Sequence, residues 1–199
     1  MSSIEVLYQL KNSFDYIVAS PTEILANGFP YDNIIGLLFE EKISYEQICS
    51  EYVNFFQNKN GILQSASIAV IKTSELKEFA RIISTIIDEK HMDFNIDSAF
   101  QYERGNNYCI FDLGEYISCV TNKNLRDKAI SKFKEMIPIY RHTEYFYNTI
   151  PLEKSSGVSI YIPNYKSSYD KIEDFYKQLL WSNESNFNNV YYDNISSFL

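Results

Sequence analysis

Four short apolar runs alternate with segments of helical periodicity along this chain of 199 residues. The runs are residues 16–19, residues 67–71, an extended stretch over 139–147, and residues 158–162. Short apolar runs of this kind are typical of buried strands. Strands that alternate with amphipathic helices predict an α/β fold, in which helices flank a largely parallel sheet.

Capping residues and apolar spacing predict where the helices lie. Ser2 or Ser3 can cap a first helix, and residues 44–47 have capping-box spacing ahead of a second. Ser74 is expected to cap the most regular helix, and Asn124 to open another. The helix after Ser74 has a continuous apolar stripe that predicts packing against the sheet: Leu76, Phe79, Ile82, Ile83, Ile86 and Ile87.

The carboxy-terminal region divides into a periodic and an aperiodic part. After Ser168, apolar residues at helical spacing predict a further helix, which ends near Trp181. From Ser182 onward the sequence is polar and aromatic without a period. We therefore expect one domain over residues 1–181, and an appended strand or partly ordered tail over residues 182–199.

Composition excludes several classes of function. Eighteen basic and 26 acidic residues give a net charge of −8, which argues against nucleic acid as a partner. No apolar run approaches the roughly 18 residues of a membrane span. Three cysteines without Cys-x-x-Cys spacing predict neither a disulfide scaffold nor a zinc site, and no calcium or phosphate loop is present. We expect no cofactor and no metal.

The segment that follows the first predicted strand resembles a known family. It reads Tyr-Ile-Val-Ala-Ser-Pro-Thr-Glu-Ile at residues 16–24 and Gly-Phe-Pro-Tyr at residues 28–31. Together with Phe-Asp-Leu at residues 111–113 and the run over residues 156–163, it is similar to the region after the catalytic cysteine of clostripain-family cysteine peptidases. The resemblance implies part of a caspase-like αβα sandwich, in a family whose members are often exported.

The same resemblance implies which catalytic groups this sequence lacks. It places the family's cysteine immediately before Met1 and the histidine further upstream. No catalytic residue is therefore assigned here, and we expect a truncated peptidase without its own His/Cys dyad. The missing amino-terminal half is then an expected partner.

The loop after the first strand is the implied substrate pocket, with Ser20, Thr22, Glu23 and Asn27 as its candidate residues. Relatives prefer a basic residue, and the carboxylate of Glu23 suits arginine or lysine. Alternatively, Thr22 and Glu23 only hold the loop together. Asn27 stands where relatives often have an acidic residue, which leaves basic specificity open. Asp32 can replace that charge, or cap the next helix, which we favour.

Two other interpretations of the sequence remain. A dyad within the chain would have to combine His91 or His142 with one of three cysteines that read as packing residues: Cys49, Cys109 and Cys119. The main alternative to a truncated endopeptidase is a non-catalytic module that binds peptides or proteins on the same scaffold, with an exposed sheet edge completed by strand addition.

Overall fold

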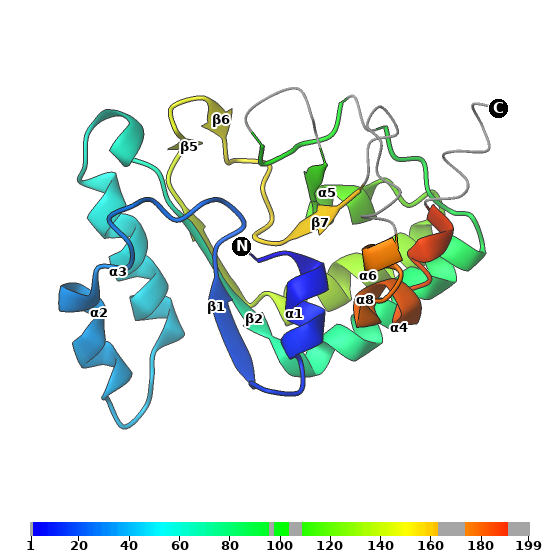
Figure 1. Cartoon of the computed structure of the whole chain (residues 1–199), viewed down its shortest axis with the longest axis horizontal. Coiled ribbons are helices and arrows are strands. Elements are labelled where there is room, and N and C mark those ends of the chain that lie inside the picture. The colour runs from blue at the N-terminus through cyan, green and yellow to red at the C-terminus, as the bar shows by residue number, and fades with distance from the viewer. Residues whose placement is uncertain (1, 96–97, 104–108, 163–173, 191–199) are drawn as a thin grey trace.

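The computed structural model describes residues 2–95, 98–103, 109–162 and 174–190. Its strands form a three-stranded sheet in the order β1-β2-β4 and two separate strand pairs, β3-β7 and β5-β6. Figure 1 shows the three-stranded sheet between two groups of helices. The strand bounds are β1 Tyr16–Ala19, β2 Ser67–Lys72, β3 Ile110–Asp112, β4 Ile139–His142, β5 Tyr145–Phe146, β6 Ile150–Pro151 and β7 Ser159–Tyr161.

The prediction of a largely parallel sheet is wrong, because every pair of these strands is antiparallel. The long segment between β1 and β2 contains helices, but it leaves and returns at the same end of the sheet. Ala19 therefore lies opposite Ala69, and the Ser20 hydroxyl lies 3.0 Å from that of Ser67. A helical connection produces parallel neighbours only when it crosses to the other end of the sheet. Within the described residues, the one parallel contact is an isolated bridge between Ser3 and Ser159.

One face of the sheet is covered by α2 (Tyr31–Leu38) and α3 (Tyr45–Gln57). Alternate side chains of β2 point to this face, where Ile68 and Val70 are fully buried. They belong to a core cluster with residues of α2, α3, the loop before α2 and the residue before β2: Leu25, Ile34, Ile48, Cys49, Tyr52, Val53, Phe56 and Ala66.

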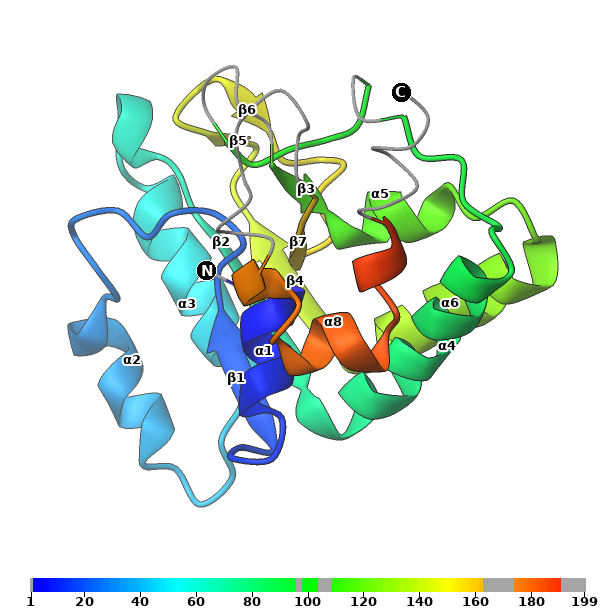
Figure 2. The ribbon, with the colours of Figure 1, turned by 45° about the vertical axis from the view of Figure 1, so that its right-hand side comes forward.

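The opposite face carries the larger core, in which Ala69 and Ile71 of β2 pack against several helices. Figure 2 shows α4 and α6 side by side, with α1 and α8 nearer the viewer. The helix bounds are α1 Ile4–Leu10, α4 Leu76–Asp88, α5 Leu113–Ser118, α6 Lys123–Met136 and α8 Leu180–Glu184, with short 3-10 turns at η1 Gly61–Leu63 and η2 Thr73–Glu75. None of the helices in the described ranges is long and apolar enough to cross a membrane.

The predicted boundary between residues 181 and 182 falls inside α8. Trp181 and Phe187 are both fully buried in the larger core. The helix predicted after Ser168 and ending near Trp181 begins on residues outside the described part, which resumes at residue 174. Residues 174–176 are helical, residues 177–179 are not, and α8 then begins at Leu180. Residues 191–199 of the predicted tail also lie outside it.

Helix starts agree with the sequence at two sites and differ at two others. One of these is α6, which Asn122 caps, so that Asn124 lies inside its first turn. The Ser3 hydroxyl accepts from the Val6 amide, and the Ser44 hydroxyl from the Gln47 amide. Ser74 does not cap α4, because the chain first forms η2 and α4 begins after Glu75. Glu75 thus occupies the cap position, one residue after the predicted cap.

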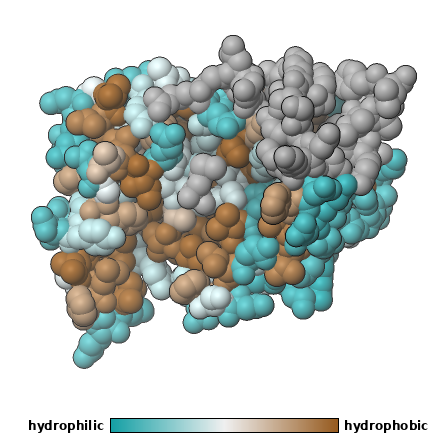
Figure 3. Space-filling model, viewed as in Figure 1, coloured by the Kyte–Doolittle hydropathy of each residue, from teal (hydrophilic) through white to brown (hydrophobic). Residues whose placement is uncertain are grey.

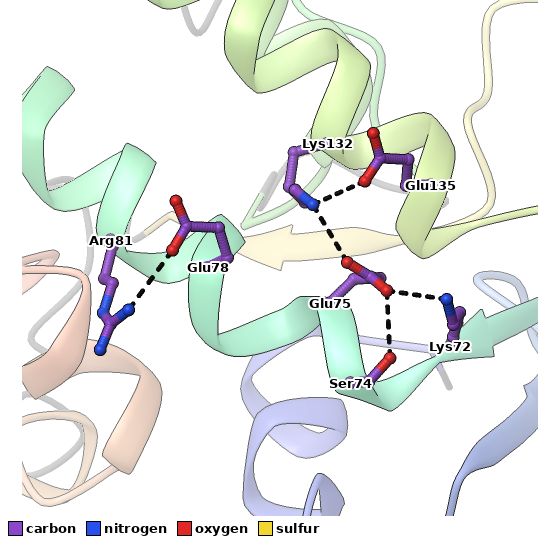
Figure 4. Close-up of polar contacts among 7 residues, drawn as sticks. All are labelled: Lys72, Ser74, Glu75, Glu78, Arg81, Lys132 and Glu135. Atoms are coloured by element: carbon purple, nitrogen blue, oxygen red, sulfur yellow. Dashed lines mark hydrogen bonds and ion pairs between the residues drawn. The ribbon is translucent and has the colours of Figure 1, made fainter.

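Glu75 joins the end of β2 to α6, as Figure 4 shows. Its carboxylate lies 2.8 Å from Lys72 Nζ and 3.0 Å from Lys132 Nζ, and Lys132 also contacts Glu135 at 2.6 Å. Hydrogen bonds from Lys72 and Lys132 lower the pKa of Glu75 to about 2. The turn that displaces Ser74 therefore places a bridging carboxylate between two elements of the fold.

Candidate functional site

A pocket of about 450 Å³ opens between the loop after β1 and the region around β3 and β5. Two of the predicted residues, Thr22 and Glu23, lie on its wall. The loop thus forms one side of a hollow to which distant parts of the chain contribute the other side. Its lining residues are Pro21, Thr22, Glu23, Tyr102, Glu103, Ile110 and Phe146.

Ser20 and Thr22 fix the loop to the sheet. Their hydroxyls and that of Ser67 form a buried cluster, with oxygen separations of 3.1 Å for Ser20–Thr22, 3.0 Å for Ser20–Ser67 and 2.7 Å for Thr22–Ser67. All three side chains are buried. Mutual hydrogen bonding satisfies polar groups that would otherwise be costly to bury. Ser20 therefore anchors the loop from beneath, while Thr22 both anchors it and lines the pocket.

Two carboxylates lie on the pocket wall. Glu23 is exposed, and its Oε2 accepts a 3.2 Å hydrogen bond from the Tyr147 hydroxyl. Glu103 Oε2 accepts from the Cys109 amide at 2.7 Å and the Ile110 amide at 3.3 Å. These bonds orient each carboxylate. A pocket with two acidic side chains is suited to a cationic group.

Glu103 was not among the predicted residues, because its segment has no regular period and lies far along the chain from Glu23. Asn27 was predicted as a pocket residue, and the structure places it in an exposed turn ahead of α2, apart from the residues that line this pocket. The prediction that Asp32 caps α2 is wrong, because Asp32 lies inside the first helical turn and Pro30 occupies the cap position.

A buried network supports the wall on which Tyr102 lies. Asp112 is fully buried, and its Oδ2 accepts from the Tyr102 hydroxyl at 2.5 Å and from the Ser156 amide at 2.7 Å. Its Oδ1 accepts from the Glu115 amide at 2.8 Å, which caps α5. Burial raises the pKa of Asp112 above its usual value, although these donors act in the opposite direction. The network connects the pocket wall to the start of a helix.

The cysteines and histidines are the candidates for a catalytic pair within the chain. Cys49 and Cys109 are buried and Cys119 is half-buried, and burial raises the pKa of Cys49 to about 12. His142 Nδ1 lies 2.8 Å from the Thr143 carbonyl oxygen, and His91 Nε2 lies 3.1 Å from a Glu89 oxygen. No hydrogen bond joins a cysteine to a histidine across the described ranges. The same ranges hold no cluster of three side chains suited to a metal ion.

Comparison with known proteins identifies the family. The model of the clostripain family matches residues 1–194. The chain belongs to the clostripain family. No curated protein gives a significant match.

Solved structures of clostripain-family proteases share the fold. A clostripain from Bacteroides thetaiotaomicron, in complex with the peptide inhibitor BTN-VLTK-AOMK, is 28% identical, with a TM-score of 0.80 over 93% of this chain and 82% of that one. A cysteine protease from B. fragilis is 25% identical, with a TM-score of 0.82 over 95% and 84%. An inactive zymogen C11 protease from Parabacteroides distasonis is 27% identical, with a TM-score of 0.79 over 93% and 56%. The chain thus spans little more than half of that zymogen.

Proposed function

We propose that this clostripain-family chain is the substrate-recognition half of a cysteine endopeptidase that cleaves after basic residues. In this proposal it lacks a His/Cys dyad of its own, and a second, amino-terminal half supplies both residues. The observation that carries the proposal is the pocket with Glu23 and Glu103 on its wall. Within the described residues, no hydrogen bond joins a thiol to an imidazole. The related clostripain supports it, since its inhibitor carries the sequence VLTK, which ends in lysine.

The carboxylates of the pocket support recognition of a cationic side chain, although position 27 is an asparagine and carries no charge. A lysine ammonium or an arginine guanidinium can donate charge-assisted hydrogen bonds to an oriented carboxylate. Glu103 is held by two backbone amides and Glu23 by a tyrosine hydroxyl, so little side-chain freedom is lost when a substrate binds. Asn27 can contact the substrate outside this pocket, as a neutral residue of the same loop.

The contacts of Ser2 support docking of a second half beside β1. The Ser2 amide donates to the Ser20 carbonyl at 2.6 Å, and the Ser159 amide donates to the Ser2 carbonyl at 2.9 Å. One residue thus bridges the end of β1 and the start of β7, as a residue of a strand placed between them would. β1 is an edge strand of its sheet. A strand placed along that edge would end next to the loop that forms the pocket.

In such a complex the chemistry would follow the general scheme for thiol peptidases. A histidine takes the proton of the cysteine thiol, the thiolate forms a bond to the substrate carbonyl carbon, and the protonated histidine gives the proton to the leaving amine. Water then hydrolyses the acyl-enzyme. This chain would hold the substrate side chain that precedes the scissile bond. It would thereby place that bond close to the thiolate, and such proximity lowers the barrier to reaction.

Hydrolysis of fluorogenic amides tests the proposal, with arginine, lysine or alanine before the scissile bond. The purified chain is compared with the chain co-expressed with an upstream half that carries the histidine and cysteine. We expect cleavage of the arginyl and lysyl amides in the complex alone, and a loss of roughly tenfold or more in kcat/KM in E23Q or E103Q. E153Q, a change at an exposed glutamate outside the pocket, is the matched control. Cleavage of the alanyl amide as fast as that of the arginyl and lysyl amides would contradict the specificity for basic residues. Cleavage by the chain alone would contradict the proposal that it lacks a His/Cys dyad.

The absence of a thiol–imidazole pair in the described ranges also favours a second function, a non-catalytic module that binds basic peptides through the same pocket. Calorimetric titration with an arginyl peptide separates the two. Binding without cleavage in the co-expressed complex supports the module, whereas cleavage supports the peptidase.

A further inference from the structure

The helix α2 is apolar on both of its sides. Ile34 is buried and Leu37 packs against the core formed with α3. On the outward side, the α2 patch consists of four side chains with exposed fractions of 61% for Tyr31, 51% for Ile35, 43% for Leu38 and 84% for Phe39. A helix that is hydrophobic all round is normally covered on every side.

The α2 patch is a surface of the kind that binds other chains. Its residues lie at positions i, i+4, i+7 and i+8, so they form one continuous stripe along the helix. Figure 3 shows hydrophobic residues gathered over the region of α2 at the lower left, next to hydrophilic ones at its tip. Large apolar side chains that cluster in this way usually mark an interaction site, unlike apolar residues that are scattered singly.

Acidic residues flank the α2 patch at both ends. Asp32 lies in the first turn, and Glu40 and Glu41 follow the last turn, with Lys42 as the one neighbouring cation in that run. All four charged side chains are exposed, and none makes an ion pair in the described ranges. The stripe is thus apolar in the middle and acidic at its ends.

We propose that the α2 patch binds a partner helix whose apolar stripe is flanked by lysine or arginine. Such a partner buries its stripe on Tyr31, Ile35, Leu38 and Phe39, and its basic ends face the acidic residues. A second copy of this chain fits less well, because acid would face acid in either orientation of two α2 helices. An anionic lipid surface would be repelled for the same reason.

Titration with a labelled synthetic helix tests the assignment. The probe is an amphipathic peptide of leucine and lysine, compared with the same pattern of leucine and glutamate. We expect the full chain to bind the lysine peptide, with affinity that falls as salt rises, and at least tenfold weaker binding of the glutamate peptide. Equal affinity for the two peptides would overturn the proposal.

Variants locate the binding site. The double variant I35S/F39S should bind the lysine peptide at least tenfold more weakly, and so should the charge reversal E40K/E41K. The controls are F175S, at a phenylalanine that is 72% exposed on another segment, and E153K. Binding that is unchanged in I35S/F39S, or weakened equally in F175S, would overturn the proposal. Two further results would also overturn the proposal. Dimers in sedimentation that are lost in I35S/F39S would show that a second copy of this chain covers the α2 patch. Binding to phosphatidylglycerol vesicles through the same residues would show that a lipid surface covers it.

Discussion

The hydroxyl of Tyr102 donates to Asp112 over 2.5 Å, which links the wall of the acidic pocket to a fully buried carboxylate. The Ser156 and Glu115 amides donate to the same carboxylate. The position of Tyr102 therefore depends on residues from the loop before β7 and from α5.

Tyr102→Phe removes one donor from this network. Because Asp112 then keeps its other donors but loses one bond in a buried place, we expect a loss of about 1–3 kcal/mol in the free energy of unfolding. Urea denaturation measures it. Tyr145→Phe, at an exposed tyrosine of β5, is the control and should leave the urea midpoint unchanged. Wild-type stability in Tyr102→Phe would show that the network does not support the pocket wall.

The sequence predicted the elements whose signals are local. The cap at Ser44 and the apolar stripe from Leu76 to Ile87 identify α3 and α4, because both depend on residues a few positions apart. Strand direction is not local. It depends on where a long connection returns, so the same pattern of strands and helices fitted a parallel sheet and an antiparallel one.

The same distinction applies to the candidate site. A resemblance in one loop indicated Thr22 and Glu23, and both lie on the pocket wall, while their role in substrate binding stays a prediction. Glu103 is held at the same pocket by the Cys109 and Ile110 amides and by the neighbouring bridge between Gln101 and Phe111. No periodicity in its own segment marks it. Tertiary contacts between remote segments are what the sequence pattern alone does not encode.

The ion pairs of Glu75 predict a dependence on pH. Its folded-state pKa of about 2 lies below the ordinary value of 4.5. The stabilisation is therefore present above pH 4.5 and is lost as the pH falls toward 2. Its partners are partly exposed, so solvent screening limits the contribution to about 1 kcal/mol. Urea midpoints of Glu75→Gln and the unmodified protein should differ at pH 7 and converge near pH 2.

Glu78→Gln is the matched control for this measurement. Glu78 contacts Arg81 at 3.4 Å, and both side chains are well exposed. The midpoint of this variant should follow that of the unmodified protein at every pH. An equal effect in the two variants would attribute the dependence to net charge instead of the Glu75 bridge.

Gly157 is required by its backbone and by its surroundings. Its φ is +94°, and an added Cβ would lie 2.8 Å from the Tyr140 ring and 3.1 Å from Ala69. We expect Gly157→Ala to lower the free energy of unfolding by about 1–3 kcal/mol, by strain and overpacking. At Gly36 in α2 nothing lies within 4 Å, so Gly36→Ala should stabilise by about 0.5–1 kcal/mol. Thermal unfolding compares them, and a stable Gly157→Ala would contradict the close packing.

The thiol of Cys49 should resist alkylation. It is fully buried on α3, and desolvation raises its pKa to about 12, so little thiolate forms near pH 8. Iodoacetamide followed by mass spectrometry should modify Cys49 at the rate of unfolding, and at least tenfold faster in urea. Rapid modification of the folded chain would show that this thiol is accessible and would reopen its assignment as a packing residue.

The segment that connects β1 to β2 begins and ends at the same place, where the Ser20 and Ser67 hydroxyls lie 3.0 Å apart. The segment between these two serines includes α2 and α3, whose inward sides pack on one face of the sheet. The exposed side chains of α2 take no part in that packing. Natural or engineered change at those exposed positions can therefore proceed without altering the register of β1 on β2, and so without moving the pocket.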